Sequence, residues 1–191
     1  MFQRLEKIIG NSSLELIHNT SVMVIGIGGV GGYVVEGLIR SGIKNIILVD
    51  FDTVDITNKN RQIIALDSTI GMKKVDVMKN RILDINKECN VITIDNFLNS
   101  ENTSDIINKY HPDYVVDACD TMTTKKEIIA SCLKYNIKFI SSMGTGDKFD
   151  PTLFEVTDIS KTSSCPFAHL LKSELKKLGI ECIYVDAASS D

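Results

Sequence analysis

The chain has 191 residues, of which 43% are apolar and 24% charged, and its formal net charge is −4. This length predicts one globular domain over residues 1–191 with a full core, and the negative charge argues against a broad nucleic-acid-binding face. The five cysteines include no CxxC pair, so neither a disulfide framework nor a structural zinc site is expected. No apolar run reaches the roughly 18 residues that span a bilayer, and the N-terminus lacks a secretory pattern. We therefore expect a cytoplasmic protein without a membrane anchor.

Apolar runs and amphipathic stretches alternate along the chain. In chain order, the first half predicts one or two helices within 2–18, a strand at 22–25, a helix over 34–39 that Gly42 ends, a strand at 46–49, a helix carrying Val75–Ile85 after Lys74, and a strand at 91–95. The middle of the chain predicts a helix at 105–110, a strand at 114–117, a helix carrying Ile128–Leu133 and a strand at 137–141. The last part predicts a strand at 152–157 outside the parallel set, a helix from Pro166 to Leu178 and a strand at 182–186. The alternation predicts an α/β fold, namely a Rossmann-like, mainly parallel sheet with helices on both faces and an added C-terminal strand and helix region. Residues 1–20 form an N-terminal helical cap in this interpretation, and residues 143–191 the substrate-side region.

A glycine-rich turn follows the first predicted strand. Backbone N–H groups of such a turn can approach an anion, and the N-terminus of the following helix favours negative charge. Asp50 lies 19 residues after Gly31, at the end of the second strand, where a ribose-binding acid is expected. The alternative, a purely structural turn, does not account for Asp50. We therefore predict a nucleotide site whose phosphate-binding backbone includes Gly26, Gly28, Gly29 and Gly31.

Polar residues gather near the predicted carboxyl ends of the strands and in the polar segment 53–69, which is long for a crossover in a compact domain. Arg61 and Lys74 could neutralise the β and γ phosphates of a nucleoside triphosphate, and Asp120 could hold Mg²⁺. A nicotinamide cofactor has no use for these two cations, and the glycine turn lacks the GK[ST] sequence of a P-loop. The pattern therefore predicts ATP with Mg²⁺.

These motifs resemble a known family. The run GIGGVG at 26–31, followed by LVDFDTVDITNKNRQ at 48–62, is similar to the adenylating domain of the ubiquitin-activating-enzyme-like (ThiF/MoeB/HesA-type) superfamily. In that family a carboxylate attacks the α-phosphate of ATP, which gives an acyl-adenylate and pyrophosphate. The resemblance implies that the ATP site includes Asp50, Asp52, Asn58, Arg61, Gln62, Lys74 and the magnesium ligand Asp120. It also places Arg4 where relatives have an arginine that reaches the ATP of the second subunit in a homodimer.

The second half of the chain carries a finer resemblance. The segments NRQIIALDSTIGMKKVDVMKNRILDINKEC, VVDACDTMTTK and DPTLFEVTDISKT are similar to the tRNA threonylcarbamoyladenosine dehydratases, and this similarity extends over residues 2–185. It implies a ligase-type enzyme that uses ATP to cyclise threonylcarbamoyladenosine in tRNA to a hydantoin, with net loss of water. It further implies sulfur-relay proteins as partners and a monovalent cation, K⁺ or Na⁺, beside a loop shaped by Gly144 and Gly146.

Two other functions compete with this interpretation. A related enzyme class adenylates the C-terminal glycine of a ubiquitin-like sulfur carrier, but its members usually carry two zinc-binding CxxC pairs, which this chain lacks. A nucleotide sensor or scaffold with a degenerate site is the non-enzymatic alternative, and the complete set of Asp50, Arg61, Lys74 and Asp120 argues against it.

The remaining polar residues are expected to have structural or solvated roles. Asp117 is interpreted as a strand-end acid, Lys125 as a surface lysine rather than a phosphate or RNA contact, Cys119 as a small buried thiol, Cys165 as non-catalytic, and Lys172, Lys176 and Lys177 as a solvated helix face rather than an RNA patch.

Overall fold

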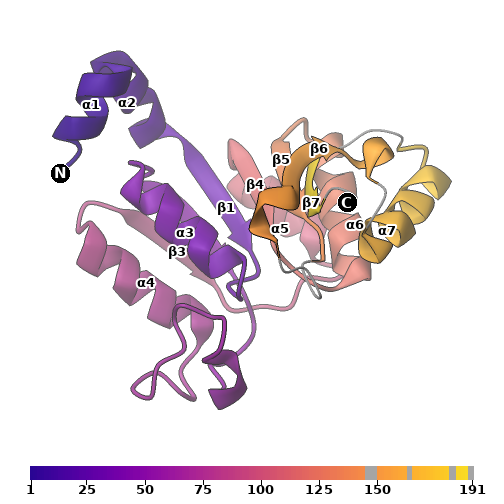
Figure 1. The fold of residues 1–191 in the computed structure, drawn as a ribbon, viewed down its shortest axis with the longest axis horizontal. Coiled ribbons are helices and arrows are strands. Elements are labelled where there is room, and N and C mark those ends of the chain that lie inside the picture. Colours follow the sequence, from indigo (N-terminus) through magenta and orange to yellow (C-terminus); the bar gives the residue numbers. More distant parts are fainter. Residues whose placement is uncertain (145–149, 163–164, 181–183, 189–191) are drawn as a thin grey trace. The chain divides into compact units, whose positions relative to one another are not determined.

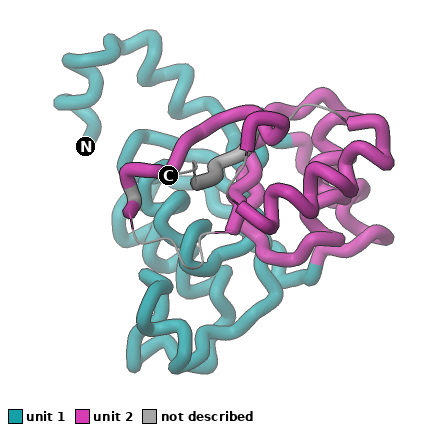
Figure 2. Tube along the Cα trace, turned by 45° about the vertical axis from the view of Figure 1, so that its right-hand side comes forward, with its two compact units in different colours: residues 1–97, 112–115 teal, residues 98–111, 116–191 magenta. Residues whose placement is uncertain are grey.

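The computed structural model describes residues 1–144, 150–162, 165–180 and 184–188. These residues divide into two compact units, which Figure 2 shows in different colours. Unit 1 contains Met1–Phe97 and Pro112–Val115, and unit 2 contains Leu98–His111 and Val116–Asp191. Neither unit is a contiguous stretch of sequence, because Leu98–His111 belongs to unit 2 but precedes the last segment of unit 1; the second boundary lies within strand β4 (Tyr114–Asp117). That residues 1–191 act as one adenylating domain stays a prediction.

Unit 1 contains three parallel strands in the order β3-β2-β1. They are β1 (Ser21–Ile25), β2 (Asn45–Val49) and β3 (Asn90–Ile94), with Ser21 opposite Asn45 and Asn45 opposite Asn90. All side chains from Val22 to Ile25 and from Ile46 to Val49 are buried. Such continuous apolar runs are typical of parallel strands with both faces covered.

Unit 1 also contains helices and a 3₁₀ turn (Figure 1). They are α1 (Gln3–Ile9), α2 (Asn11–Asn19), α3 (Gly31–Arg40), the 3₁₀ turn η1 (Ile56–Asn58) and α4 (Lys74–Ile85). Helix α3 packs against β1 and α4, and α4 packs against β3. Their buried faces carry Val35, Ile39, Met78 and Ile82, at the helical spacing expected from the sequence.

Unit 2 contains a mixed arrangement of strands. Strand β5 (Lys138–Ser142) pairs in parallel with β7 (Tyr184–Ala188), and β7 pairs antiparallel with β6 (Phe154–Asp158). The antiparallel β6 confirms the expectation of a strand outside the parallel set. The helices and 3₁₀ turns are α5 (Thr103–Tyr110), α6 (Met122–Lys134), η2 (Pro151–Leu153), η3 (Ile159–Lys161) and α7 (Pro166–Lys177).

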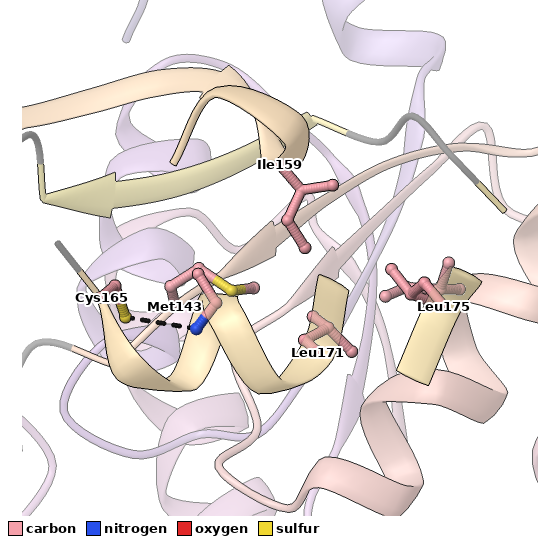
Figure 3. Packing of buried hydrophobic residues seen from close by; sticks show 7 residues of the cluster. Met143, Ile159, Cys165, Leu171 and Leu175 are labelled. Carbon is pink, nitrogen blue, oxygen red and sulfur yellow. Dashed lines mark hydrogen bonds between the residues drawn. The ribbon is translucent and has the colours of Figure 1, made fainter. Parts of the chain in front are cut away.

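The core of unit 2 forms where α7 packs against α6 and η3 (Figure 3). Its buried members are Ile129, Met143, Ile159, Cys165, Ala168, Leu171 and Leu175. Cys165 is 2% exposed, and its sulfur accepts a hydrogen bond from the backbone N–H of Ala168 at 3.5 Å, which caps the first turn of α7. Cys165 is therefore a core and capping residue.

Most predicted elements agree with the structure to within two or three residues. Lys74 opens helix α4 instead of preceding it, and the last strand lies at Tyr184–Ala188 rather than at 182–186. The beginning of that predicted strand, Cys182, lies outside the described residues. Within the described part of the chain, no helix is both long and apolar enough to cross a membrane.

Candidate functional site

The glycine turn between β1 and α3 has a backbone that requires glycine at its first position. Gly26 has a φ of +89°, which side-chain-bearing residues rarely adopt, and its N–H donates to the carbonyl of Val49 at 2.8 Å. The carbonyl of Gly28 then accepts from the N–H of Gly32 at 3.0 Å, which starts α3. The turn thus places the N-terminus of α3 at the carboxyl end of β1.

We expect Gly26→Ala to lower the free energy of unfolding by about 1–2 kcal/mol, because alanine is strained at this φ. Gly37→Ala is the matched control. Gly37 is exposed within α3 and a Cβ there meets no atom within 4 Å, so alanine should stabilise the protein by about 1 kcal/mol. Urea unfolding of both variants measures the difference, and a Gly26→Ala protein as stable as wild type would contradict the assignment.

Asp50 at the end of β2 is tied to this turn through its carboxylate. One carboxylate oxygen accepts a hydrogen bond from the backbone N–H of Ile27 at 2.6 Å, and the other accepts from the N–H of Asp52 at 2.8 Å. Burial raises the pKa of Asp50, while these hydrogen bonds and the charge of Lys74 act in the opposite direction. The structure therefore brings together the turn and the acid that the sequence predicts as ribose ligand.

The raised pKa of Asp50 has a testable consequence for stability. The folded protein binds the Asp50 proton more tightly than the unfolded chain does. Ionisation of Asp50 therefore lowers the free energy of unfolding as the pH rises from the pKa of this group in the unfolded chain to its higher pKa in the folded protein. We expect the unfolding free energy of wild type to fall relative to Asp50→Asn as pH rises through that interval, and the difference to be constant above it. Urea titrations of both proteins at several pH values measure this, and a pH-independent difference would refute it.

Lys74 and Asp52 form a half-buried ion pair beside Asp50. Lys74 Nζ lies 2.7 Å from Asp52 Oδ2, and its side chain is 6% exposed whereas that of Asp52 is 46% exposed. The backbone N–H of Lys74 also donates to the Asp52 carbonyl at 3.0 Å. Asp52 is the one hydrogen-bond partner of this ammonium within the described residues. The two other N–H bonds of the ammonium therefore remain for a ligand such as a phosphate.

Arg61 and Gln62 in the crossover segment lie against the glycine turn. A Cβ built on Gly29 would lie 3.4 Å from Arg61 Cγ, and one on Gly28 would lie 3.7 Å from Gln62 Nε2. Gln62 is 7% exposed, and its Oε1 atom is buried without a hydrogen-bond partner in the described structure. An unpaired buried amide oxygen is unfavourable unless something else satisfies it, which fits a ligand donor at this place.

Arg61 and Asn58, both in the crossover segment, differ in exposure and in hydrogen bonding. Arg61 is exposed, and its Nη1 donates to the carbonyl of Thr57 at 3.2 Å and to Asn60 Oδ1 at 3.0 Å. Asn58 Oδ1 accepts from the N–H of Asp55 at 3.0 Å in a reciprocal cap of η1. Asn58 thus braces the crossover, while Arg61 presents its guanidinium to solvent.

Asp120 follows β4 in unit 2 and is exposed. Its one contact within the described residues is a 3.4 Å approach of the Thr121 hydroxyl to Oδ1. Mg²⁺ at nucleotide sites is commonly held by one or two carboxylates together with phosphate oxygens, so this free carboxylate fits the predicted ligand.

Arg4 is exposed on α1. Gly144 follows β5, while Gly146 lies outside the described residues.

Lys125 is not the surface lysine that the sequence predicts. Its side chain is fully buried, and Nζ contacts Asp117 Oδ2 at 2.8 Å, Ser141 Oγ at 3.2 Å and the Ser142 carbonyl at 2.9 Å. The three N–H bonds of the ammonium are thereby used, which excludes a phosphate or RNA contact. A sequence signal existed, because Lys125 precedes Ile128 and Ile129 by three and four residues on the buried face of α6.

Asp117 is a buried strand-end acid, as predicted, and Cys119 is a partly buried thiol. The Cys119 sulfur donates to Asp117 Oδ1 at 3.0 Å. Burial first, and then the Asp117 charge, raise the pKa of Cys119 far above the ordinary range. A thiol held protonated in this way is a poor nucleophile, so this setting favours a structural role.

The lysines of α7 divide between contacts within unit 2 and solvent. Lys172 Nζ donates to the carbonyl of Ser160 at 2.6 Å, and Lys177 pairs with Glu174 at 2.5 Å. Glu174 also pairs with Lys126, and the two ammonium groups lower the pKa of this glutamate to about 2. Lys176 is exposed. This pattern agrees with the predicted solvated helix face.

Residues 2–183 match the protein-family model described as the ThiF family, and the chain belongs to this family. It is 49% identical over 180 residues to a tRNA threonylcarbamoyladenosine dehydratase of Bacillus subtilis (strain 168), which covers 94% of this chain and 70% of that protein. It is 38% identical over 189 residues to the protein of the same name from Escherichia coli (strain K12), covering 93% and 70%. The predicted resemblance is confirmed.

Solved structures agree with the fold. A crystal structure described as E. coli tRNA N6-threonylcarbamoyladenosine dehydratase, TcdA, in complex with ATP is similar with a TM-score of 0.91 at 35% identity, over 98% of this chain and 81% of that chain. The predicted fold class, a Rossmann-like α/β fold with a mainly parallel sheet, is confirmed.

Proposed function

We propose that this protein uses ATP to cyclise threonylcarbamoyladenosine in tRNA to its hydantoin form, through adenylation of the threonyl carboxylate. The observation that carries the proposal is the glycine turn with Asp50, Arg61 and Gln62 gathered on it, in a chain that is 49% identical to a named dehydratase. Within the described residues, Gln62 Oε1 has no hydrogen-bond partner and Lys74 Nζ has only Asp52, so both atoms can bond to a ligand.

Each part of the predicted site has a role in binding ATP. The N–H groups of the turn and of the first residues of α3 bind phosphate oxygens, and Asp50 accepts from the ribose hydroxyls. Arg61 and Lys74 neutralise the charge of the β and γ phosphates, with Asp52 orienting Lys74 and Asn58 bracing the segment that carries Arg61. Asp120 is the magnesium ligand. When bound, Mg²⁺ neutralises phosphate charge and makes the α-phosphate more susceptible to attack.

The reaction requires positioning and charge stabilisation rather than a protein nucleophile. The substrate carboxylate attacks the α-phosphate and pyrophosphate leaves. The carbamoyl nitrogen then attacks the activated carbonyl, closes the ring and expels AMP. This scheme agrees with the settings of Cys119 and Cys165, whose sulfurs take part in hydrogen bonds within unit 2.

The alternative function is adenylation of the C-terminal glycine of a ubiquitin-like sulfur carrier. It is not favoured, because the sequence has no CxxC pair and the more similar relatives carry the dehydratase name. Incubation with ATP and tRNA that bears threonylcarbamoyladenosine, followed by nucleoside mass spectrometry, separates the two. Loss of one water from the nucleoside supports the dehydratase; an unchanged nucleoside together with an adenylated carrier protein would overturn it.

A homodimer completes the proposal. Arg4 is exposed on α1, and the apolar side chains of Ile8 and Leu16 on the two N-terminal helices are also exposed, as at surfaces that bind a partner. If Arg4 reaches the ATP of the second subunit, Arg4→Ala and Asp120→Ala should each be inactive alone. Mixing them should restore part of the pyrophosphate release, because each heterodimer contains one intact composite site. No recovery in heterodimers that have verifiably formed would contradict this role.

Three finer points belong to the same proposal. The protein acts in the cytoplasm, where its tRNA substrate is found. Sulfur-relay proteins are its further partners. A monovalent cation, K⁺ or Na⁺, binds beside Gly144, and the dependence of AMP formation on added K⁺ or Na⁺ tests it.

A further inference from the structure

The loop that carries Asp120 is held by a buried polar cluster in unit 2. We call this cluster the Lys125 cluster; its members are Asp117, Cys119, Lys125, Ser141 and the carbonyl of Ser142. It joins the end of β4, the first turn of α6 and the end of β5, so three elements that are separate in sequence meet at one ammonium group.

Hydrogen bonds hold the backbone on both sides of Asp120. Before it, the N–H of Cys119 donates to Asp117 Oδ1 at 3.2 Å. After it, the carbonyl of Thr121 accepts from the N–H of Lys125 at 3.0 Å, within the first turn of α6. The short loop from Asp117 to Thr121 is therefore anchored at each end, which restricts the direction in which the Asp120 side chain leaves the backbone.

Lys125 determines the orientation in which the Asp117 carboxylate holds this loop. Lys125 Nζ and the Ser141 hydroxyl both donate to Asp117 Oδ2, at 2.8 Å and 2.6 Å, so the other oxygen, Oδ1, is turned toward Cys119. A buried carboxylate is stable in its charged form only when it is paired and hydrogen-bonded. The ammonium therefore pairs with the buried Asp117 carboxyl group and holds it in the orientation in which Oδ1 contacts the loop.

The ammonium also contacts the last residue of β5 and a ring on α7. It donates to the Ser142 carbonyl at 2.9 Å and lies 5.8 Å from the centre of the Phe167 ring on α7. The carbonyl of Gly144 accepts from the Cys165 thiol at 3.7 Å, at the beginning of the same helix. Lys125 thus contacts the residue that precedes the predicted substrate-side region and one aromatic ring within that region.

We propose that Lys125 is a positioning residue for the magnesium ligand: it orients Asp117, which holds the 117–121 loop so that Asp120 is directed toward the metal. This inference rests on the proposed function, in which Asp120 binds the Mg²⁺ of Mg·ATP. It gives the buried pair a role in the reaction that neither residue could have through direct contact with the nucleotide.

A purely structural role for the pair is the competing explanation, and a double substitution separates the two. Asp117→Asn with Lys125→Met removes both buried charges and keeps the side-chain volumes similar, so it leaves no unpaired charge. Asparagine still offers an oxygen to Cys119, but of the two groups that orient residue 117 only the Ser141 hydroxyl then remains. Lys126→Met is the control, because Lys126 is the next residue of α6 and pairs with Glu174 instead.

The test uses the full chain and two measurements. Calorimetric titration with ATP, without tRNA, at a series of Mg²⁺ concentrations gives the metal dependence of binding, and pyrophosphate release gives that of turnover. For the double variant we expect a urea midpoint close to that of wild type but a Mg²⁺ requirement raised about 10–100-fold in both measurements, the usual effect of losing a residue that orients a metal ligand. Lys126→Met should match wild type in both.

The outcomes are distinguishable. A folded double variant with the wild-type Mg²⁺ requirement would overturn the positioning role and leave the proposed function intact. A wild-type protein that shows no Mg²⁺-dependent ATP binding would overturn the proposed function itself, and the positioning role with it. If the double variant does not fold, Ser141→Ala decides, because it keeps the ion pair and removes one of the two groups that orient Asp117. A raised Mg²⁺ requirement supports the inference, and an unchanged one refutes it.

Discussion

Asp120→Asn is expected to reduce ATP-dependent pyrophosphate release by at least about 100-fold while leaving the fold intact. The substitution removes the charge that would bind Mg²⁺ but keeps the size of the side chain. Asp120 is exposed and its one hydrogen-bond contact among the described residues is a long approach of Thr121, so the free energy of unfolding should change by no more than about 0.5 kcal/mol. Pyrophosphate release at saturating ATP, together with urea unfolding, measures both quantities.

The control for this prediction is Glu101→Gln, which removes an exposed carboxylate that precedes α5 in the same unit. It should leave both turnover and stability unchanged. Turnover of Asp120→Asn equal to that of wild type would refute the magnesium role, and a large loss of stability in this variant would show that Asp120 has a structural role that its contacts do not reveal.

Lys125→Met should have the largest effect on stability of any single substitution considered for this protein. It leaves the fully buried Asp117 carboxylate without its ionic partner, and breaking a buried pair in this way typically costs about 3–5 kcal/mol. For a chain of this length, that corresponds to a fall in Tm of about 6–20 °C. Asp117→Asn alone should be similarly destabilising, because it leaves the ammonium unpaired, and the double variant should recover most of the loss.

Lys126→Met provides the comparison within the same helix. Its ammonium lies 2.8 Å from Glu174, and both side chains are partly exposed to water, so its loss should cost no more than about 1 kcal/mol. Thermal unfolding of the three variants measures the contrast. If Lys125→Met lowered Tm no more than Lys126→Met does, the buried ion pair would not contribute the stability that its complete burial implies.

The order of helices and strands, and the place of the glycine turn, could be predicted from the sequence because they depend on local properties. Apolar runs long enough for a buried strand precede Gly26 and Asp50, and glycine is strongly favoured at a φ as positive as the +89° of Gly26. The approach of Asp50 to the turn follows from the same pattern, since neighbouring parallel strands end at one edge of the sheet.

Other parts of the site depended on how distant segments pack. The polar sequence of the crossover segment predicts a loop. The folded segment places Arg61 and Gln62 against the glycine turn and buries the Gln62 amide. A polar side chain is assigned to the surface by default because desolvation is costly. Only the packed structure shows where a nearby group offsets that cost.

Lys125 shows this limit most clearly. The sequence predicts a surface lysine there, although Lys125 lies three and four residues before Ile128 and Ile129 on α6, because the burial of an ammonium is tolerable only if acceptors reach it from elsewhere. Asp117 lies eight residues earlier in the chain, and Ser141 and Ser142 lie 16 and 17 residues later on β5. The sequence by itself thus determined the nucleotide turn and its acid, because their chemistry is local. The tertiary structure alone decided which charges are buried, because burial of a charge depends on partners that folding brings from distant strands.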